Sequence, residues 1–475
     1  MKTRLSLFFA ILATVAVSLA PAPAASQYWE YGPDTGFQFF RFDGIYFPDT
    51  GLVYFLGGRL ADDTTDGSVW SFDPETGTYT DTGVDLPLPV SNYTLNILQD
   101  STGKGIYLVS GRLGNSSYTH AVQVYYPATN TAVQLPGADD WPTPPRIPGG
   151  VVEHGNKLYV FGGTRASDSW DFAQTWVFDP SLASGSRWSQ LVGVNLTQSR
   201  GFIYACVVDG YAYAIGGEHY SALDTLAATT RTERLNLSNT AALWDNASVA
   251  DLSTDDGTGE GRAFGFDSGA GHPLAGHIVI AGGGQWPSEW ANCSDYSVAA
   301  NTWSTFPSLV EARRDFASAF VPSADGGTMW VFGGRRWTDS NVLTTSERYV
   351  IAPPVPQGLD VTVNHTTLAA GDTFTVDVAV QPLTATFDAW GCIFGPGASA
   401  YSFTLGNPTS LRSGTDPLVQ DIPGLPAVYT TRLLEMTIPP GVGGEYTVVV
   451  ELVPANLDPL IPIEGYADEV DVTVH

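Results

Sequence analysis

The chain of 475 residues has little cysteine, little positive charge and, beyond its start, no long apolar run. Its three cysteines are odd in number and widely spaced, which does not indicate a disulfide framework or a zinc site. Lysine and arginine number 21 against 49 acidic residues, so the formal net charge is -28. Without a basic run, nucleic acid is excluded as a partner. We predict neither a metal site nor a cofactor.

One longer apolar stretch does occur, at the N-terminus. Lys2 and Arg4 precede the apolar stretch 5–19, which is too short for a convincing membrane span. Small residues at 22–26 offer cleavage sites, so residues 1–26 are interpreted as a signal peptide. We therefore predict an exported protein, either secreted to the extracellular space or periplasmic, with no membrane span.

Glycine and aromatic residues are abundant, and they form a repeat. Six strand-like apolar runs end in a glycine pair or a near copy of one, at steps of 53, 52, 54, 66 and 51 residues. A glycine pair lets the chain turn where a Cβ would clash. The clearest copy, residues 157–191, contains three strand-like runs separated by turn residues. The six pairs are Gly57-Gly58, Ser110-Gly111, Gly162-Gly163, Gly216-Gly217, Gly282-Gly283 and Gly333-Gly334.

A strand ending in Gly-Gly, repeated about every 50 residues, resembles the kelch repeat of the galactose oxidase and kelch-like superfamily. The resemblance covers residues 27–351 and implies an all-β, six-bladed kelch-type β-propeller with one blade per repeat. The last repeat lacks a fourth strand, and residues 27–32 form a strand without a repeat of their own. We expect residues 27–32 to supply that outer strand and close the ring.

The rest of the chain has a different pattern. Residues 352–358 are rich in proline and are predicted to be a stiff linker. Residues 359–475 contain about seven short runs of alternating apolar and polar residues, which favours an immunoglobulin-like β-sandwich. The disulfide of antibody domains is absent, since only Cys392 lies in this region.

Arginine marks two repeated places along the six repeats. The first is a slot just before or at the start of each first strand, where five of six residues are arginine: Arg41, Asn92, Arg146, Arg200, Arg262 and Arg314. The second follows the glycine pairs and comprises Arg59, Arg112, Arg165, Glu218, His219, Gln285, Trp286, Arg335 and Arg336. In kelch propellers both places open on one face around the central channel, so the resemblance implies an arginine-lined channel mouth.

Guanidinium groups bind carboxylates with two hydrogen bonds and stack on aromatic rings. We therefore predict a binding protein for a protein or glycan partner, recognising an anionic, carbohydrate or peptide ligand. The predicted ligand-binding residues are Arg41, Arg59, Arg112, Arg146, Arg165, Arg200, Arg262, Arg314, Arg335, Arg336 and Trp286. The alternative for the first set is structural, with each arginine bonded to neighbouring carbonyls and carboxylates. Candidate carboxylates are Asp43, Asp209, Asp267 and Asp315.

A carbohydrate-active enzyme is the alternative function, and a purely structural surface protein is a third. Glu218 and His219 are candidates for a general acid and base, because histidine titrates near neutral pH. The domain order resembles galactose-oxidase-like copper enzymes, although the repeats number six rather than seven and the histidines match no ligand motif. The repeat number and the export signal resemble the six-bladed kelch epimerase of sialic acid, which lacks the appended sandwich.

Overall fold

The structure is a computed structural model of the chain. It describes residues 28–114, 117–165, 170–220, 226–239, 241–252, 259–285, 287–323, 326–338, 340–351, 359–380, 387–395, 399–402, 419–422, 429–440, 443–454 and 467–475. The predicted signal peptide and the predicted linker lie outside these residues. The described residues divide into two compact units, 28–351 and 359–475.

The predicted all-β fold is confirmed, since the described residues contain one short 3-10 turn, η1 (Gly137–Asp139), and otherwise strands. Six antiparallel sheets follow one another within residues 28–351, and we number them 1 to 6 in chain order. Sheets 1 to 3 are β2 (Gly44–Phe47), β3 (Leu52–Arg59), β4 (Thr65–Asp73), β5 (Thr78–Asp85); β6 (Asn96–Gln99), β7 (Lys104–Arg112), β8 (Tyr118–Tyr126), β9 (Thr131–Gln134); and β10 (Gly150–Glu153), β11 (Leu158–Phe161), β14 (Gln174–Phe178), β15 (Trp188–Asn195). Sheets 4 to 6 are β16 (Tyr204–Val208), β17 (Tyr211–Ile215), β20 (Thr232–Asn236); β21 (Arg262–Gly265), β22 (His277–Ala281), β25 (Cys293–Ser297), β26 (Thr302–Phe306); and β27 (Ala317–Ser323), β28 (Gly326–Phe332), β31 (Ser346–Ile351), β1 (Glu30–Tyr31).

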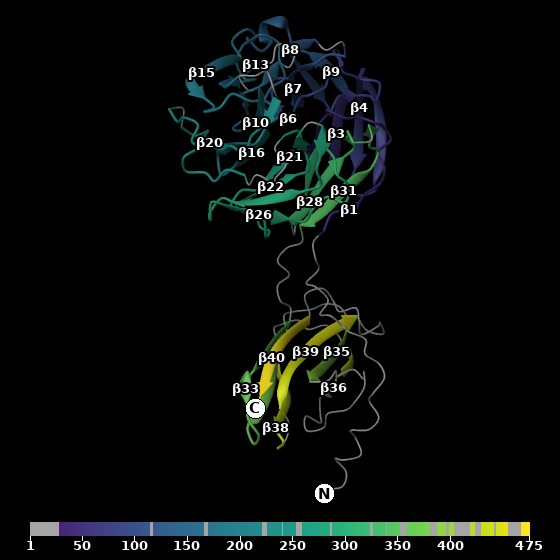
Figure 1. The fold of residues 1–475 in the computed structure, drawn as a ribbon. Coiled ribbons are helices and arrows are strands. Elements are labelled where there is room, and N and C mark those ends of the chain that lie inside the picture. The colour runs from purple at the N-terminus through teal and green to yellow at the C-terminus, as the bar shows by residue number, and fades with distance from the viewer. Residues whose placement is uncertain are drawn as a thin grey trace. The chain divides into compact units, whose positions relative to one another are not determined.

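The first strand of each sheet lies toward the middle of this unit, and later strands lie toward its rim (Figure 1). Neighbouring first strands contact one another in the series β6, β10, β16, β21, β27 and β2. Sheets 1 and 2 are joined just before their first strands, where the backbone N–H of Asn92 donates to the carbonyl oxygen of Arg41 at 2.7 Å.

Sheet 6 is built from both ends of the unit, as the sequence predicts. β1 pairs antiparallel with β31, with Glu30 opposite Arg348 and Tyr31 opposite Glu347. Trp29, which is 2% exposed, packs beside Tyr349 with ring centroids 5.7 Å apart. The N-terminal strand is therefore held by the backbone ladder and by a buried aromatic side chain.

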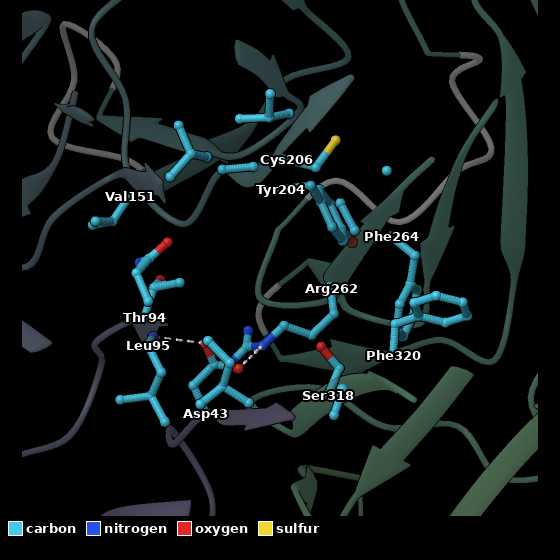
Figure 2. A pocket seen from close by; sticks show the side chains of 18 of the residues that line it. Asp43, Thr94, Leu95, Val151, Tyr204, Cys206, Arg262, Phe264, Ser318 and Phe320 are labelled. Carbon is cyan, nitrogen blue, oxygen red and sulfur yellow. Dashed lines mark hydrogen bonds and ion pairs between the residues drawn. The ribbon is translucent and has the colours of Figure 1, made fainter. Parts of the chain in front are cut away.

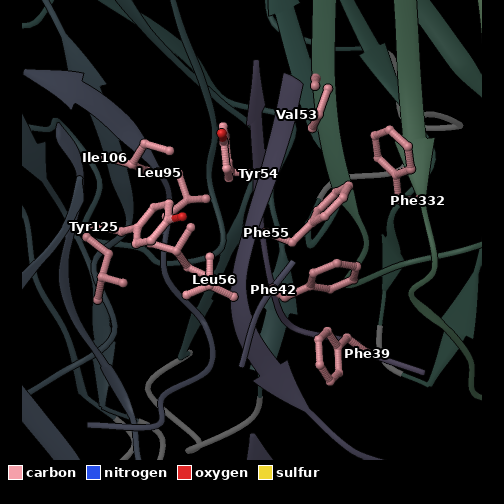
Figure 3. Packing of buried hydrophobic residues seen from close by; sticks show 14 of the residues in the cluster. Phe39, Phe42, Val53, Tyr54, Phe55, Leu56, Leu95, Ile106, Tyr125 and Phe332 are labelled. Carbon is pink, nitrogen blue, oxygen red and sulfur yellow. The ribbon is translucent and has the colours of Figure 1, made fainter. Parts of the chain in front are cut away.

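Sheets 1 and 6 pack face to face through aromatic side chains (Figure 3). Phe55 of β3 lies edge-on to Phe332 of β28, with ring centroids 4.8 Å apart, and Phe72 lies 5.1 Å from Trp330. Burying a phenylalanine side chain of this kind contributes roughly 1.5–3 kcal/mol. The contact ties the first repeat to the last one.

Four two-stranded hairpins follow glycine pairs. They are β12 (Thr164–Arg165) with β13 (Trp170–Asp171), β18 (Glu218–Tyr220) with β19 (Leu226–Ala228), β23 (Gly284–Gln285) with β24 (Ser288–Glu289), and β29 (Arg335–Arg336) with β30 (Asn341–Val342). In sheets 1 and 2 the second and third strands themselves continue past the glycines, with a register shift there. Both arrangements place the second predicted arginine set on strands.

The unit 359–475 consists of two further sheets. One contains β32 (Leu359–Val363), β34 (Thr373–Val380) and β38 (Tyr429–Thr437); the other contains β33 (Thr367–Leu368), β40 (Ala467–Val474), β39 (Gly444–Pro454), β35 (Phe387–Gly395), β36 (Ser399–Ser402) and β37 (Val419–Ile422). Alternate residues of both sheets enter one hydrophobic cluster, among them Val376, Leu434, Val448 and Val472. This arrangement fits the predicted β-sandwich.

Cys206 and Cys293 are both buried, unpaired thiols. The sequence places Cys293 in a loop that could be exposed, and this expectation is wrong, because Cys293 begins β25 inside a hydrophobic cluster. Burial raises the pKa of Cys293 to about 12. Neither thiol is therefore suited to reaction at neutral pH. Within the described part of the chain, no helix has the length and apolarity needed to span a membrane.

Candidate functional site

A backbone bridge in every repeat joins the two places that the sequence marks with arginine. Each bridge links a residue just before a first strand to a residue just after a glycine pair or its near copy. The bridged pairs are Phe40–Arg59, Ser91–Arg112, Ile147–Thr164, Gly201–Glu218, Gly259–Gly284 and Arg314–Arg335. The two predicted sets therefore lie side by side in each repeat.

The same bridges show that the residues of the first predicted arginine set do not occupy equivalent positions in the six repeats. Arg41 follows its bridged residue, and Arg314 is itself bridged. Arg146 and Arg200 precede theirs by one residue, and Arg262 comes three residues after Gly259. These shifts decide where each side chain points, because side-chain direction alternates along an extended chain.

Four arginines, Arg41, Arg59, Arg112 and Arg335, lie close together, and we call them the arginine cluster. Burial and the charges of Arg41 and Arg112 lower the pKa of Arg59 to about 10. Burial and the charge of Arg41 also lower the pKa of Arg112 and of Arg335. The four guanidinium groups therefore repel one another and would be stabilised by an added anion.

The carboxylates around the arginine cluster make only long contacts with it. Asp63 Oδ1 lies 3.9 Å from Arg59 Nη1 and 3.8 Å from Arg335 Nη1, and its side chain is 65% exposed. Arg41 lies 3.5 Å from Asp315 and 3.7 Å from Glu260. None of these pairs has the close two-bond geometry that a guanidinium makes with a well-fitted carboxylate.

Aromatic rings hold Arg335 in place. Its guanidinium lies 3.8 Å from the ring centroid of Trp337 and 4.8 Å from that of Phe40. Nε and Nη1 of Arg335 are buried and have no hydrogen-bond acceptor among the residues that the structure describes, and the same holds for Nε of Arg59. A residue fixed on two rings, with donors unused, is preorganised for a ligand that accepts hydrogen bonds.

Arg314 belongs to a more enclosed group of charges beside the cluster. Its Nη2 donates to Glu260 and lies 3.7 Å from Glu218 Oε1, and all three side chains are buried. Glu218 and His219 are consecutive residues of β18, so their side chains point to opposite faces of the strand. The structure therefore does not bring the predicted acid and base together.

Three other predicted residues have structural partners. Arg200 is fully buried and donates to the carbonyl oxygens of Gly216 and Ala214 and to Glu233. Arg262 donates to Asp43 Oδ1 at 3.1 Å, and Arg336 donates to Glu311 at 2.6 Å. These three arginines are therefore bonded to carbonyls and carboxylates of the protein itself, as the structural alternative predicts.

Of the four aspartates predicted as structural partners of these arginines, two lie near an arginine and two bind backbone groups instead. Asp43 pairs with Arg262 and Asp315 lies near Arg41. Asp209 and Asp267 instead bind backbone N–H groups between sheets 4 and 5. Arg146 precedes the first strand of sheet 3, and Arg165 lies in the hairpin that follows the glycine pair of that sheet. Trp286 lies outside the described residues.

A cavity of about 370 Å³ runs beside the arginine cluster and is lined by the first strands of all six sheets (Figure 2). Its walls are both polar and apolar, and the Asp43–Arg262 ion pair lines it, with Leu95 N–H donating to Asp43 Oδ2 at 3.0 Å. Burial raises the pKa of Asp43 despite the nearby charge of Arg262. A smaller adjacent cavity of about 60 Å³ is lined by Arg41, Glu260 and Asp315. Of the arginine cluster, Arg41 lines this smaller cavity, which shares lining residues with the larger one.

The structure reveals two residues of the site that the sequence interpretation missed. Asp63 is assigned from sequence to a solvated turn, but it lies between Arg59 and Arg335. Glu260 lies in a stretch interpreted as a mobile acidic loop, but it is 7% exposed and binds Arg314. A left-handed backbone at Glu260, with φ 58°, aims this side chain, and no sequence signal for glutamate indicates it. Among the described residues, no group of three His, Cys, Asp or Glu could hold a metal ion.

Comparison with known proteins gives a likeness of fold. No protein-family model matches the chain, and no curated protein matches it by sequence. The solved structure of YjhT, a β-propeller-type protein, is similar over 73% of this chain and 99% of its own length, with a TM-score of 0.52 and 18% identity. At that identity the likeness bears on the fold alone, and it agrees with the all-β architecture.

Proposed function

We propose that the six sheets form a closed kelch-type propeller whose arginine cluster binds an anionic ligand, such as a carboxylate-bearing glycan or an acidic peptide. Support for closure comes from the β1–β31 pairing, from the packing of sheet 1 on sheet 6, and from a cavity bordered by all six first strands. With its N-terminal export signal, the protein acts outside the cytoplasm as a binding protein. The sandwich 359–475 is an appended immunoglobulin-like domain.

One observation carries the proposal. The chain has a formal charge of -28, yet four arginines gather at one place. Buried N–H groups of Arg59 and Arg335 have no acceptor among the described parts of the chain. Arg200, by contrast, donates from Nε, Nη1 and Nη2 to acceptors within the protein. A carboxylate ligand would accept hydrogen bonds from Arg59 and Arg335 and relieve the mutual repulsion.

The test is a binding screen of the mature full-length protein against arrays of acidic glycans and acidic peptides. For any ligand found, Arg335→Ala and Arg112→Ala are expected to weaken binding by about tenfold to 100-fold, as for a lost charged hydrogen bond. Arg336→Ala is the matched control, because the neighbouring Arg336 is paired with Glu311. Equal binding by all three variants would refute this choice of site.

A carbohydrate-active enzyme is the second candidate, favoured by the buried carboxylates of Glu218 and Glu260 beside Arg314. An epimerase acting on an acidic sugar suits this group of charges, since Arg314 would pair with the substrate carboxylate and the glutamates would move the proton. Exchange between sugar anomers or epimers, followed by proton NMR, tests the idea. Loss of catalysed exchange in Glu218→Gln, with binding retained, would support the enzyme over the binding protein.

A further inference from the structure

Arg146, Arg200 and Arg313 occupy the same structural position in sheets 3, 4 and 6, one residue before the bridged residue. In sheets 4 and 6 the third strand supplies a carboxylate for that arginine. Arg200 Nη1 donates to Glu233 at 2.5 Å, and Arg313 Nη2 donates to Glu347 at 2.7 Å. Both arginines and both glutamates are fully buried, so each is an internally neutral pair.

Sheet 3 keeps the arginine and lacks the carboxylate. Glu233 lies opposite Ala214, and Glu347 lies opposite Val331, each one step from the residue preceding the glycine pair. The residue in that register in sheet 3 is Trp176, opposite Val160. Sheet 3 therefore has the buried cation, but it has the indole of Trp176 in the register where sheets 4 and 6 have a carboxylate.

The surroundings of Arg146 supply hydrogen-bond donors without acceptors. Arg146 is 1% exposed and lies between two rings, 3.8 Å from the centroid of Phe172 and 4.4 Å from that of Trp141. Within the part of the chain that the structure describes, Nε and Nη2 of Arg146 have no hydrogen-bond partner. The same is true of Nε1 of Trp141 and of Trp176, which pack in one hydrophobic cluster.

The other charge that acts on Arg146 has the wrong sign. Burial and, second to it, the charge of the nearby cation Arg165 lower the pKa of Arg146 to about 9. A buried ion without a partner is strongly destabilising, because it has lost its hydration and gained no counter-charge. Sheet 3 therefore keeps a buried cation without a carboxylate at the position where sheets 4 and 6 have a neutral ion pair.

We propose that Arg146 is the centre of a buried site for a small monovalent anion, either a halide or the carboxylate of a small acid, in sheet 3. The anion accepts hydrogen bonds from the guanidinium and supplies the negative charge that Glu233 and Glu347 supply in sheets 4 and 6. The indole N–H groups of Trp141 and Trp176 are the further donors in this cluster. The site is separate from the arginine cluster and does not depend on the proposed function.

The test measures thermal unfolding of the mature full-length protein while chloride or formate replaces isethionate, a larger anion, at constant ionic strength. Both small anions are expected to raise the melting temperature in a saturable way. At an anion concentration of about 100 Kd, the unfolding equilibrium constant falls about 100-fold. The anion that saturates at the lower concentration identifies the halide or the carboxylate as the preferred occupant.

Two variants make the result specific to Arg146. Trp176→Glu supplies the internal carboxylate that sheets 4 and 6 possess, and Arg146→Leu removes the charge, so each is expected to abolish the anion response. Lys157→Met is the control, since Lys157 is a half-exposed cation of the same repeat that pairs with Asp179. A response that is missing in the parent protein, or equal in all variants that fold, would overturn the proposal. If Trp176→Glu does not fold, Arg146→Leu decides alone.

Discussion

At the scale of single residues, the surroundings of each arginine decide what that arginine does. Arg200 uses its donors on two carbonyl oxygens and on Glu233, whereas Arg335 lies on Trp337 with two buried nitrogen atoms that find no acceptor among the described residues. Both residues look alike in the sequence, since each belongs to a repeated arginine position. Only the contacts separate an arginine that stabilises the fold from one that is available to a ligand.

The Arg200–Glu233 pair gives a residue-scale prediction. Arg200→Met is expected to lower the free energy of unfolding by about 3–5 kcal/mol, because Glu233 is left as an unpaired buried charge. The double variant Arg200→Met with Glu233→Met is expected to recover most of that loss. Guanidinium unfolding of the single and double variants checks this. A single variant within about 1 kcal/mol of the parent protein would contradict the predicted role.

Asp100 predicts a pH dependence of stability. Burial alone would raise its pKa, but hydrogen bonds from the hydroxyl groups of Tyr107 and Tyr126, at 2.7 and 2.6 Å, and from the backbone N–H groups of Thr102 and Gly103 lower it below 3.8. A depressed carboxyl pKa stabilises the fold above the unfolded-state pKa, and this contribution is lost as the pH falls through the folded-state value.

We therefore expect Asp100→Asn to lower the free energy of unfolding at pH 7 by about 1.5–3 kcal/mol, as for hydrogen bonds to a charged group. The difference from the parent protein should disappear at a pH below the folded-state pKa, where the parent Asp100 is itself protonated. Urea unfolding of both proteins across this pH range checks the sign. A constant difference at every pH would show that the ionised carboxylate is not responsible.

At the scale of elements, the short strand β1 has consequences beyond its two residues. It completes sheet 6 by pairing with β31, more than 300 residues away along the chain. Its backbone bonds cover an edge that β31 would otherwise expose. The buried Trp29 just before it anchors the strand, whereas the Glu30–Arg348 ion pair is about 40% exposed on both sides and contributes little.

Trp29→Ala is expected to lower the free energy of unfolding by about 3–5 kcal/mol, the usual cost of truncating a buried tryptophan. Glu30→Ala, the matched control one residue later, is expected to cost less than about 1 kcal/mol. Chemical unfolding measures both values, and limited proteolysis reports whether the N-terminal segment has detached. Similar stability in the two variants would show that packing of Trp29 does not hold this strand.

At the scale of the whole molecule, the chain contains two units with separate hydrophobic clusters. The cluster of residues 359–474 includes no described residue of the first unit. Units with independent cores need not unfold together, and multi-domain chains commonly depart from two-state behaviour.

Calorimetry of the full-length protein is therefore expected to show two unfolding transitions. Trp29→Ala should lower the temperature of only one of them, because Trp29 belongs to a cluster formed by residues 29–351. Val448→Ala in the second unit is the matched change and should lower only the other transition. One transition that both variants shift equally would show that the two units unfold as one.

The sequence by itself determined the all-β class, the six glycine-pair repeats, the presence of an N-terminal strand, found at Glu30–Tyr31, and the change of pattern after residue 351. These features depend on local chemistry, because glycine at a tight turn and alternating apolar residues act within a few positions of the chain. Tertiary structure alone decided which arginines meet, that Asp63 and Glu260 join them, and that Arg146 lacks the carboxylate that Arg200 and Arg313 have. A shift of one residue in register turns a side chain to the opposite face, and the partners that determine charge pairing come from strands distant in sequence.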